Sequence, residues 1–170
     1  MPIHHSSFQS PIGIIEIKAS DENIISVHFT HSLKNEIPGT QTPEIEKATF
    51  PIPVECEKQL TEYFDGKRTI FQLPLYQHGT DFQQQVWAEL LHIPYGRTTS
   101  YLELSKRINN VKAIRAVGTT NGSNSIAIIV PCHRVIGSNG ELTGYSGELW
   151  RKKWLLDHEQ KYAHGVQTLF

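Results

Sequence analysis

Two short runs in which β-branched and polar residues alternate stand near the start of the chain. PIGIIEIKAS covers residues 11–20 and NIISVHFTHS covers residues 23–32, with turn-forming residues 20–23 at their junction. Alternation with a period of two on both sides of a turn predicts a β-hairpin. A loop rich in Pro, Gly and Thr is expected over residues 35–53. The apolar spacing in VECEKQLTEYFDGK, residues 54–67, then predicts a helix that stops near Gly66.

Helical spacing dominates the second half of the chain. Thr80 and Gln83 match a capping box, and the helix that follows is expected to stop at PYG, residues 94–96. Its apolar stripe consists of Phe82, Val86, Leu90 and Ile93. The segments TTSYLELSKRI and KAIRAVGTTN predict two more helices around the break NNV, the second ending before Gly122. Two short basic helices joined by a tight turn make a candidate helix-turn-helix.

The apolar run SIAIIVPCHRVI, residues 125–136, predicts an extended segment that bends at Pro131. A loop, GSNGELTGYSGE, leads from it into LWRKKWLLDHEQ, residues 149–160. An amphipathic helix is suggested there by Leu149, Lys153, Trp154 and the step from Leu156 to Asp157. Together the elements indicate an α+β fold. We expect a small N-terminal α/β domain with the hairpin, residues 1–78, and a mainly helical C-terminal domain with the helix-turn-helix, residues 79–170.

Composition and charge narrow the class of protein. The chain has 170 residues, of which 38% are hydrophobic, and no segment reaches the roughly 20 apolar residues that span a bilayer. The start MPIHHSSFQS lacks the pattern of a secretory signal, and two isolated cysteines fit a reducing cytoplasm. Five basic residues and one acidic residue lie between Arg97 and Arg115. They indicate either a solvated helix surface or a phosphate-binding face.

Cys132, in VPCHRVI, has three interpretations: a buried core residue, a metal ligand or a nucleophile. A free cysteine is commonly a buried core residue, and Cys56 is interpreted in that way. A metal site is poorly supported because C-x-x-C is absent, although His4, His5, His28 and His31 could gather near one another. The adjacent His133 favours a third interpretation, a nucleophile, because a thiol with a pKa near 8.5 needs a base to form thiolate.

Neighbouring side chains of an extended segment point to opposite faces, so we expect a water molecule to connect the Cys132 sulfur to the His133 imidazole. The imidazole in turn needs a carboxylate to fix its tautomer, and spacing alone leaves that acid open.

Several motifs in order resemble those of the O6-alkylguanine-DNA alkyltransferases, which are also called methylated-DNA–protein-cysteine methyltransferases. They are GTDFQQQVWAELLHIPYGRTTSY, KAIRAVG, NGSN, the PCHRVI segment and GYSGELWRKKWLLDHE, between residues 79 and 159. The first half of the chain merely suits the variable N-terminal domain of that family. One departure is Glu148, which stands where many relatives have glycine and puts tolerance for bulky alkyl groups in doubt.

The resemblance implies a chemical role for five residues. Cys132 is the alkyl acceptor, and His133 acts as its base through the water. Glu159 orients His133. Tyr101 donates a proton or hydrogen bond to the departing guanine, and Asn124 ties the helix pair to the cysteine segment.

The resemblance also implies the contacts to DNA. Arg115 fills the gap left by a flipped, alkylated guanine, while the helix that carries it enters the minor groove of double-stranded DNA. Small residues let that helix approach closely, and its lysine adds a phosphate contact: Ala113, Ala116, Gly118 and Lys112. The guanine is contacted by Tyr145 and Ser146 and by the backbone carbonyls of Cys132 and Val135. Transfer happens once per molecule, without metal or cofactor, and we expect a monomer.

Two other classes of function are weighed against this one. A thiol hydrolase would use Cys132 and His133 repeatedly, but a recognisable oxyanion-hole motif is missing and the basic helices would be unexplained. A DNA lesion-sensing module without alkyl transfer would leave Cys132 as a core residue. The Cys132–His133 pair and Glu159 argue against that module.

Overall fold

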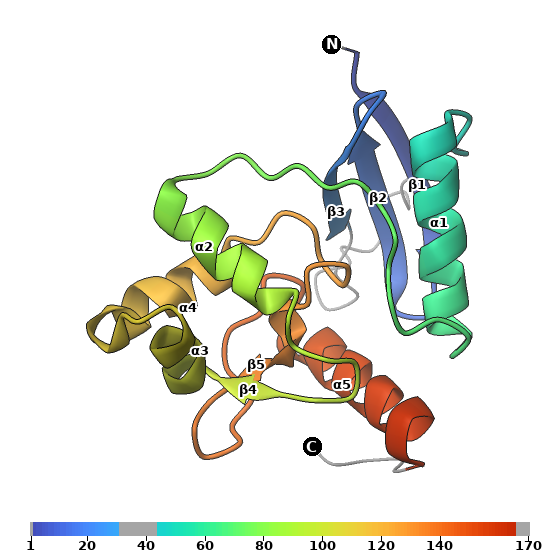
Figure 1. Cartoon of the computed structure of the whole chain (residues 1–170). Helices are drawn as coiled ribbons and strands as arrows, with labels where there is room; N and C mark the ends of the chain where they lie inside the picture. Colours follow the sequence, from blue (N-terminus) through green and yellow to red (C-terminus); the bar gives the residue numbers. More distant parts are fainter. Residues whose placement is uncertain (1, 31–43, 166–170) are drawn as a thin grey trace, which may run out of the picture. The chain divides into compact units, whose positions relative to one another are not determined.

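The computed structural model describes residues 2–30 and 44–165. It divides into two compact units, Met1–Gln77 and His78–Phe170. The first is a small sheet with a helix and the second is mainly helical (Figure 1). The expected α+β fold is confirmed.

The N-terminal unit is a three-stranded antiparallel sheet covered by one helix. Strands β1 (His4–Ser10), β2 (Gly13–Ala19) and β3 (Ile24–Phe29) lie in the order β1-β2-β3. Helix α1 (Pro51–Phe64) packs on the sheet (Figure 1). Pairing of β2 with β3 confirms the predicted hairpin. Strand β1 was not predicted, because its buried positions include serines, and the Ser7 hydroxyl accepts a hydrogen bond from the Glu46 backbone at 2.9 Å.

Helix α1 begins earlier than its sequence pattern indicated. The predicted loop over residues 35–53 lies partly outside the described residues, and its end is wrong because the helix already starts at Pro51. Proline suits the first helical turn, where a backbone N–H has no helical partner to lose. Cys56 is fully buried among the apolar residues of this helix, which confirms it as a core residue. Burial raises the pKa of its thiol to about 12.

The C-terminal unit starts with helix α2 (Asp81–Leu90), whose predicted capping box is present. The Thr80 hydroxyl accepts from the Gln83 backbone at 3.2 Å, and the Gln83 side chain accepts from the Thr80 backbone at 2.9 Å. Helices α3 (Tyr101–Arg107) and α4 (Ile114–Gly122) follow, separated by a 3₁₀ turn, η2 (Val111–Ala113). They pack on each other, but their use as a helix-turn-helix remains a prediction.

The segment before Cys132 is folded rather than extended, so the predicted extended conformation is wrong. Residues 127–129 form a turn in which Ile128 has a φ of +70°, and η3 (Cys132–Arg134) is a 3₁₀ turn. Only β5 (Val135–Ile136) is a strand, and it pairs in parallel with β4 (Thr99–Ser100). Asn124 causes the turn, because its side-chain amide donates to the carbonyls of Ile126 at 3.2 Å and Val130 at 2.8 Å.

Helix α5 (Leu149–His164) is longer than predicted, and its buried face differs from the expected one. Leu156 is buried as expected, but Leu149 is 46% exposed and does not belong to the buried face. The buried side chains are largely polar: Arg151, Lys152, Leu155, Leu156, His158, Glu159 and Gln160. Polar groups are buried in such numbers only where they find partners, so the buried face of α5 indicates a functional site.

Candidate active site around Cys132

Cys132 lies at the start of η3 and is almost completely covered, with 4% of its surface exposed. Its backbone carbonyl accepts hydrogen bonds from the Asn121 side chain at 3.2 Å and from the Val135 backbone N–H. Burial raises the pKa of the Cys132 thiol, while a hydrogen bond from Asn124 and the charge of Lys152 act in the opposite direction. A thiol in this environment needs help to ionise.

Glu159 lies against the imidazole of His133, 26 residues away in sequence. The Nε2 atom of His133 and the Oε2 atom of Glu159 are 2.6 Å apart, and both side chains are buried. Burial lowers the pKa of His133 although Glu159 opposes this effect, so the imidazole is neutral at pH 7. Burial would raise the pKa of Glu159, but His133 and Arg134 outweigh it and hold the pKa well below its usual range. The acid that sequence spacing left open is therefore in place.

This contact fixes which nitrogen of His133 is able to accept a proton. An ionised carboxylate is an acceptor only, so Nε2 carries the hydrogen and Nδ1 is the basic atom. The Nδ1 atom is buried and has no hydrogen-bond partner among the described residues. An unpaired base on the residue next to Cys132 in the sequence is a group that a water-mediated proton transfer could use.

Arg134 and Gly96 hold Glu159 in place, and the sequence reasoning missed both. The Arg134 guanidinium donates from Nε to Oε1 of Glu159 at 2.7 Å and from an Nη atom to Oε2 at 3.2 Å. Its other Nη atom donates to the Ile93 carbonyl at 2.7 Å, and the Gly96 N–H donates to Oε1 of Glu159 at 3.2 Å. The signal available in the sequence was the HR pair that follows Cys132 together with a Pro-Tyr-Gly turn, because a buried carboxylate needs a cation and an N–H donor.

The loop over residues 137–148 carries two of the predicted contact residues. The Tyr145 hydroxyl is buried and has no hydrogen-bond partner in the described part of the chain, and burial, helped by the charge of Cys132, raises its pKa well above the usual value. Ser146 is exposed. The Tyr101 hydroxyl of α3 donates to the Thr143 carbonyl at 2.9 Å, so this loop is fixed to the helix pair.

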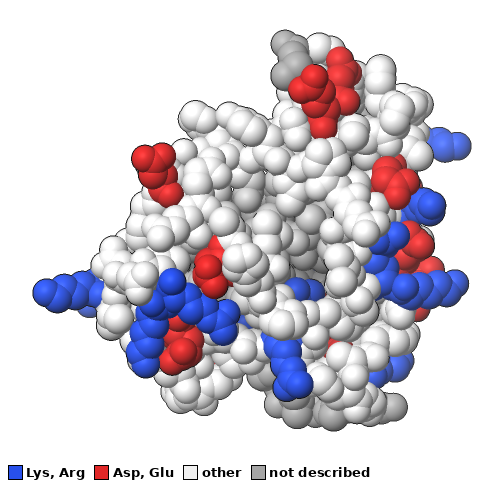
Figure 2. All heavy atoms as spheres, in the orientation of Figure 1, with Lys and Arg blue, Asp and Glu red and all other residues white. Residues whose placement is uncertain are grey.

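The remaining predicted contact residues lie on and just before α4. Arg115, Lys112 and Ala116 are exposed, while Ala113 and Gly118 are half-buried. A Cβ atom added at Gly118 would lie 3.8 Å from the Tyr101 ring, so this glycine faces α3. Basic side chains, with acidic ones among them, gather on the part of the surface formed by α3 and α4 (Figure 2). The ion pair between Lys106 and Glu103, with an N–O distance of 3.2 Å, belongs to it.

Comparisons with known proteins agree with this geometry. Residues 81–161 match the family described as "6-O-methylguanine DNA methyltransferase, DNA binding domain", and residues 3–77 match its ribonuclease-like domain. A methylated-DNA–protein-cysteine methyltransferase of Mycobacterium bovis is 43% identical over 168 residues, which is 99% of each chain. The chain belongs to the 6-O-methylguanine-DNA methyltransferase family. A constitutive enzyme of the same name from Bacillus subtilis is 38% identical, covering 92% of this chain and 95% of the relative.

The similarity to this family includes the fold of a solved structure. The structure of Mycobacterium tuberculosis OGT in complex with DNA matches with a TM-score of 0.79 and 41% identity, and 94% of each chain is covered. The helical unit of this family member therefore has the architecture of a relative that was crystallised with DNA.

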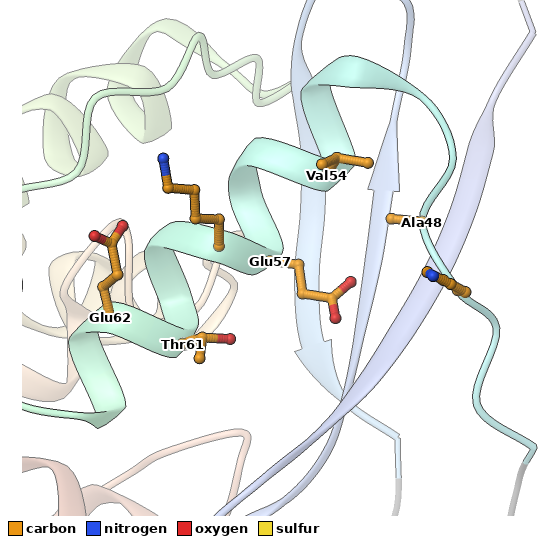
Figure 3. A pocket seen from close by; sticks show the side chains of 7 residues that line it. Ala48, Val54, Glu57, Thr61 and Glu62 are labelled. Carbon is orange, nitrogen blue, oxygen red and sulfur yellow. The ribbon is translucent and has the colours of Figure 1, made fainter.

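A hollow in the N-terminal unit of this methyltransferase family member lacks the groups that the chemistry of Cys132 needs. A hollow of about 410 Å³ lies along α1 in the N-terminal unit (Figure 3) and is lined by Lys47, Ala48, Val54, Glu57, Lys58, Thr61 and Glu62, none of which is a thiol or an imidazole. His4 lies against Asp21 at 2.6 Å, and no cluster of three metal-ligating side chains occurs within residues 2–30 and 44–165. His31 lies outside these ranges. No helix in the described ranges is long and apolar enough to cross a membrane.

Proposed function

We propose that this protein repairs DNA by transferring an alkyl group from O6 of guanine to its own Cys132. The observation that carries the proposal is the 2.6 Å contact between His133 and Glu159 beside a buried cysteine, in a chain that belongs to the 6-O-methylguanine-DNA methyltransferase family. Family membership supplies the substrate class, and the buried pair supplies a base for the thiol.

The chemical step conserves atoms and charge. His133 Nδ1 takes the Cys132 proton through a water molecule, and the thiolate attacks the alkyl carbon. A sulfur–carbon bond forms while the bond from that carbon to O6 breaks, and its electron pair stays on the oxygen. The departing guanine takes up a proton, for which Tyr101 is the proposed donor. Because Tyr101 now donates to Thr143, it has to release that carbonyl when guanine binds.

The guanine itself is proposed to bind against Tyr145 and Ser146. The Tyr145 hydroxyl is buried and lacks a partner in the described ranges, so it is available for a hydrogen bond to the base. The Cys132 carbonyl already accepts two hydrogen bonds, which favours the Val135 carbonyl as the acceptor for the exocyclic amine.

Access to the alkyl group requires that the nucleotide leave the base stack. Flipping costs a few kcal/mol of unstacking, which a side chain inserted in its place offsets. Arg115 is exposed and forms no ion pair among the described residues, so its guanidinium is available for this role. We propose that Ala113, Ala116 and Gly118 let α4 approach the minor groove and that Lys112 contacts phosphate. The protein is proposed to act in the cytoplasm, in accord with its unpaired cysteines. It is also proposed to act as a monomer.

The first prediction concerns stoichiometry and separates this function from a binding module or a hydrolase. A thioether on carbon is not reversed by an ordinary base, so each molecule should repair at most one lesion. Intact mass after mixing with DNA containing O6-methylguanine should increase by one methyl group, on Cys132, and Cys132→Ala should gain nothing. Sustained repair with excess substrate would contradict the proposal, as would an unchanged mass.

A further inference from the structure

Lys152 is a buried cation that the proposed chemistry leaves unused. It lies on α5 with 0% of its surface exposed. Its ammonium donates to the Thr143 carbonyl at 2.8 Å and to the Gly144 carbonyl at 3.3 Å. No carboxylate in the described part of the chain forms an ion pair with it, whereas its neighbour Lys153 is 43% exposed and pairs with Asp157 at 2.7 Å.

A buried ammonium that only carbonyl dipoles solvate is costly, so a nearby anion should accompany it. Three buried groups of the site could carry negative charge. Glu159 is already matched by Arg134 and His133. The Tyr145 hydroxyl stays neutral because burial raises its pKa. The Cys132 thiolate is the third group, and its charge opposes the burial that lowers the pKa of Lys152 to about 8.

The same ammonium also fixes the loop that carries the guanine contacts. The Thr143 carbonyl accepts from both Lys152 and the Tyr101 hydroxyl, and the Lys152 ammonium lies 5.9 Å from the centre of the Tyr101 ring. Tyr145 and Ser146 follow directly in sequence. If Tyr101 releases Thr143 when guanine binds, Lys152 still holds the loop.

We propose that Lys152 is a positioning residue for alkyl transfer, whose ammonium is the counter-charge of the Cys132 thiolate and the permanent anchor of loop 137–148. This inference rests on the proposed function. It adds a second residue that favours ionisation of the thiol. His133 removes the proton, and Lys152 stabilises the anion that remains.

The test measures the reactivity of Cys132 in the full chain without DNA. The rate of alkylation by iodoacetamide, followed by peptide mass between pH 6 and 10, reports the fraction of thiolate at Cys132. Lys152→Met should raise the apparent pKa of the thiol by about one unit or more, which is a loss of about tenfold or more in thiolate at pH 7. Lys152→Arg should keep part of the thiolate at pH 7, because the positive charge is retained. Lys153→Met is the matched control and should leave the profile unchanged.

A measurement on the wild-type protein covers the case in which Lys152→Met does not fold. The ammonium of Lys152 is titrated by NMR with isotope-labelled lysine, with Lys152→Arg assigning the signal. Converting Cys132 to a thioether removes the anion, so Lys152 should then lose its proton at a lower pH. An unchanged titration, or an unchanged profile in folded Lys152→Met, would overturn the proposal. Failure of the wild-type protein to gain mass from methylated DNA would overturn the proposed function instead, because neither thiol measurement uses DNA.

Discussion

Glu159 is the residue whose contacts most directly define the site. It accepts from His133, Arg134 and Gly96, and these three partners stabilise the ionised form. The amide in Glu159→Gln has one oxygen in place of two and no charge. We expect the variant to fold and to bind DNA, but to react with free O6-benzylguanine at least tenfold more slowly at pH 7, with a pH profile displaced upward.

The matched experiment for this relay is the double variant with His133→Ala. Members of one relay fail together, so Glu159→Gln with His133→Ala should react scarcely more slowly than either single variant. Additive losses in the rate of reaction with O6-benzylguanine would show that the two residues act separately.

Gly96 is a second position where the effect of a substitution follows directly from the structure, because a single added Cβ atom would disturb the packing. Its φ is +74°, and an added Cβ would lie 2.5 Å from the Cβ of Ala163 on α5. Gly96→Ala should lower the free energy of unfolding by at least about 2 kcal/mol, from backbone strain and from displacement of α5. Gly140 is the control, because its φ is +84° and a Cβ there meets nothing within 4 Å. Gly140→Ala should cost about 1 kcal/mol by urea unfolding, and equal losses would contradict the packing argument.

At the scale of elements, periodicity predicted the helices better than it predicted the segment that carries the nucleophile. Helix α3, the capping box of α2 and the β2–β3 hairpin follow their predicted patterns, although α2 ends at Leu90, before Ile93 and the predicted stop at residues 94–96. The run before Cys132 reads as extended because it is apolar, yet the side chain of Asn124 folds it into a turn. Likewise the buried face of α5 is polar, because it serves His133 and the loop rather than an apolar core. A hydrophobic pattern does not indicate which polar side chains form hydrogen bonds with each other or with the backbone.

Helix α4 is the element on which DNA access depends. Because Arg115 is exposed and lies outside the buried cluster around Cys132, its loss should leave the chemistry of the thiol intact. We expect Arg115→Ala to slow repair of O6-methylguanine in duplex DNA by at least tenfold while changing the reaction with free O6-benzylguanine less than twofold. Rates from quenched reactions on both substrates check this. Equal losses would place Arg115 in the pocket, and no loss would leave it a surface charge.

Across the whole molecule, the sequence predicted which residues carry the chemistry more readily than which residues contact one another. The roles of Cys132 and His133 were suggested by their adjacency, whereas only the family pattern connected Glu159 to them. Arg134, Gly96 and Lys152 were missed, because each acts through a backbone carbonyl, a backbone N–H or a distant charge that only the folded chain brings together. Burial of His133 and Glu159 also ties the stability of the C-terminal unit to pH.

The last prediction concerns this dependence on pH. The pKa of His133 is lowered by burial, so below its usual value of about 6.5 the unfolded chain takes up a proton that the native protein does not. The free energy of unfolding should therefore fall as the pH drops below about 6.5. The pKa of Glu159 is lowered too, against the burial that would raise it, by His133 and Arg134, so a second loss should begin near the unfolded value of about 4.3. Urea unfolding of the full chain between pH 8 and 2 measures both.

Two variants assign these losses to their residues. His133→Asn should remove the loss between about pH 6.5 and 4.3, and Glu159→Gln should flatten the curve below about pH 4.3 although it begins from a lower stability. Glu141 is exposed and forms no ion pair among the described residues, so Glu141→Gln should follow the wild-type curve. A wild-type curve that stays level from pH 8 to 2 would show that folding does not change the pH at which His133 and Glu159 take up their protons. The carboxylate would then not be held ionised by its buried partners, and the relay from Glu159 to Cys132 would lose its physical basis.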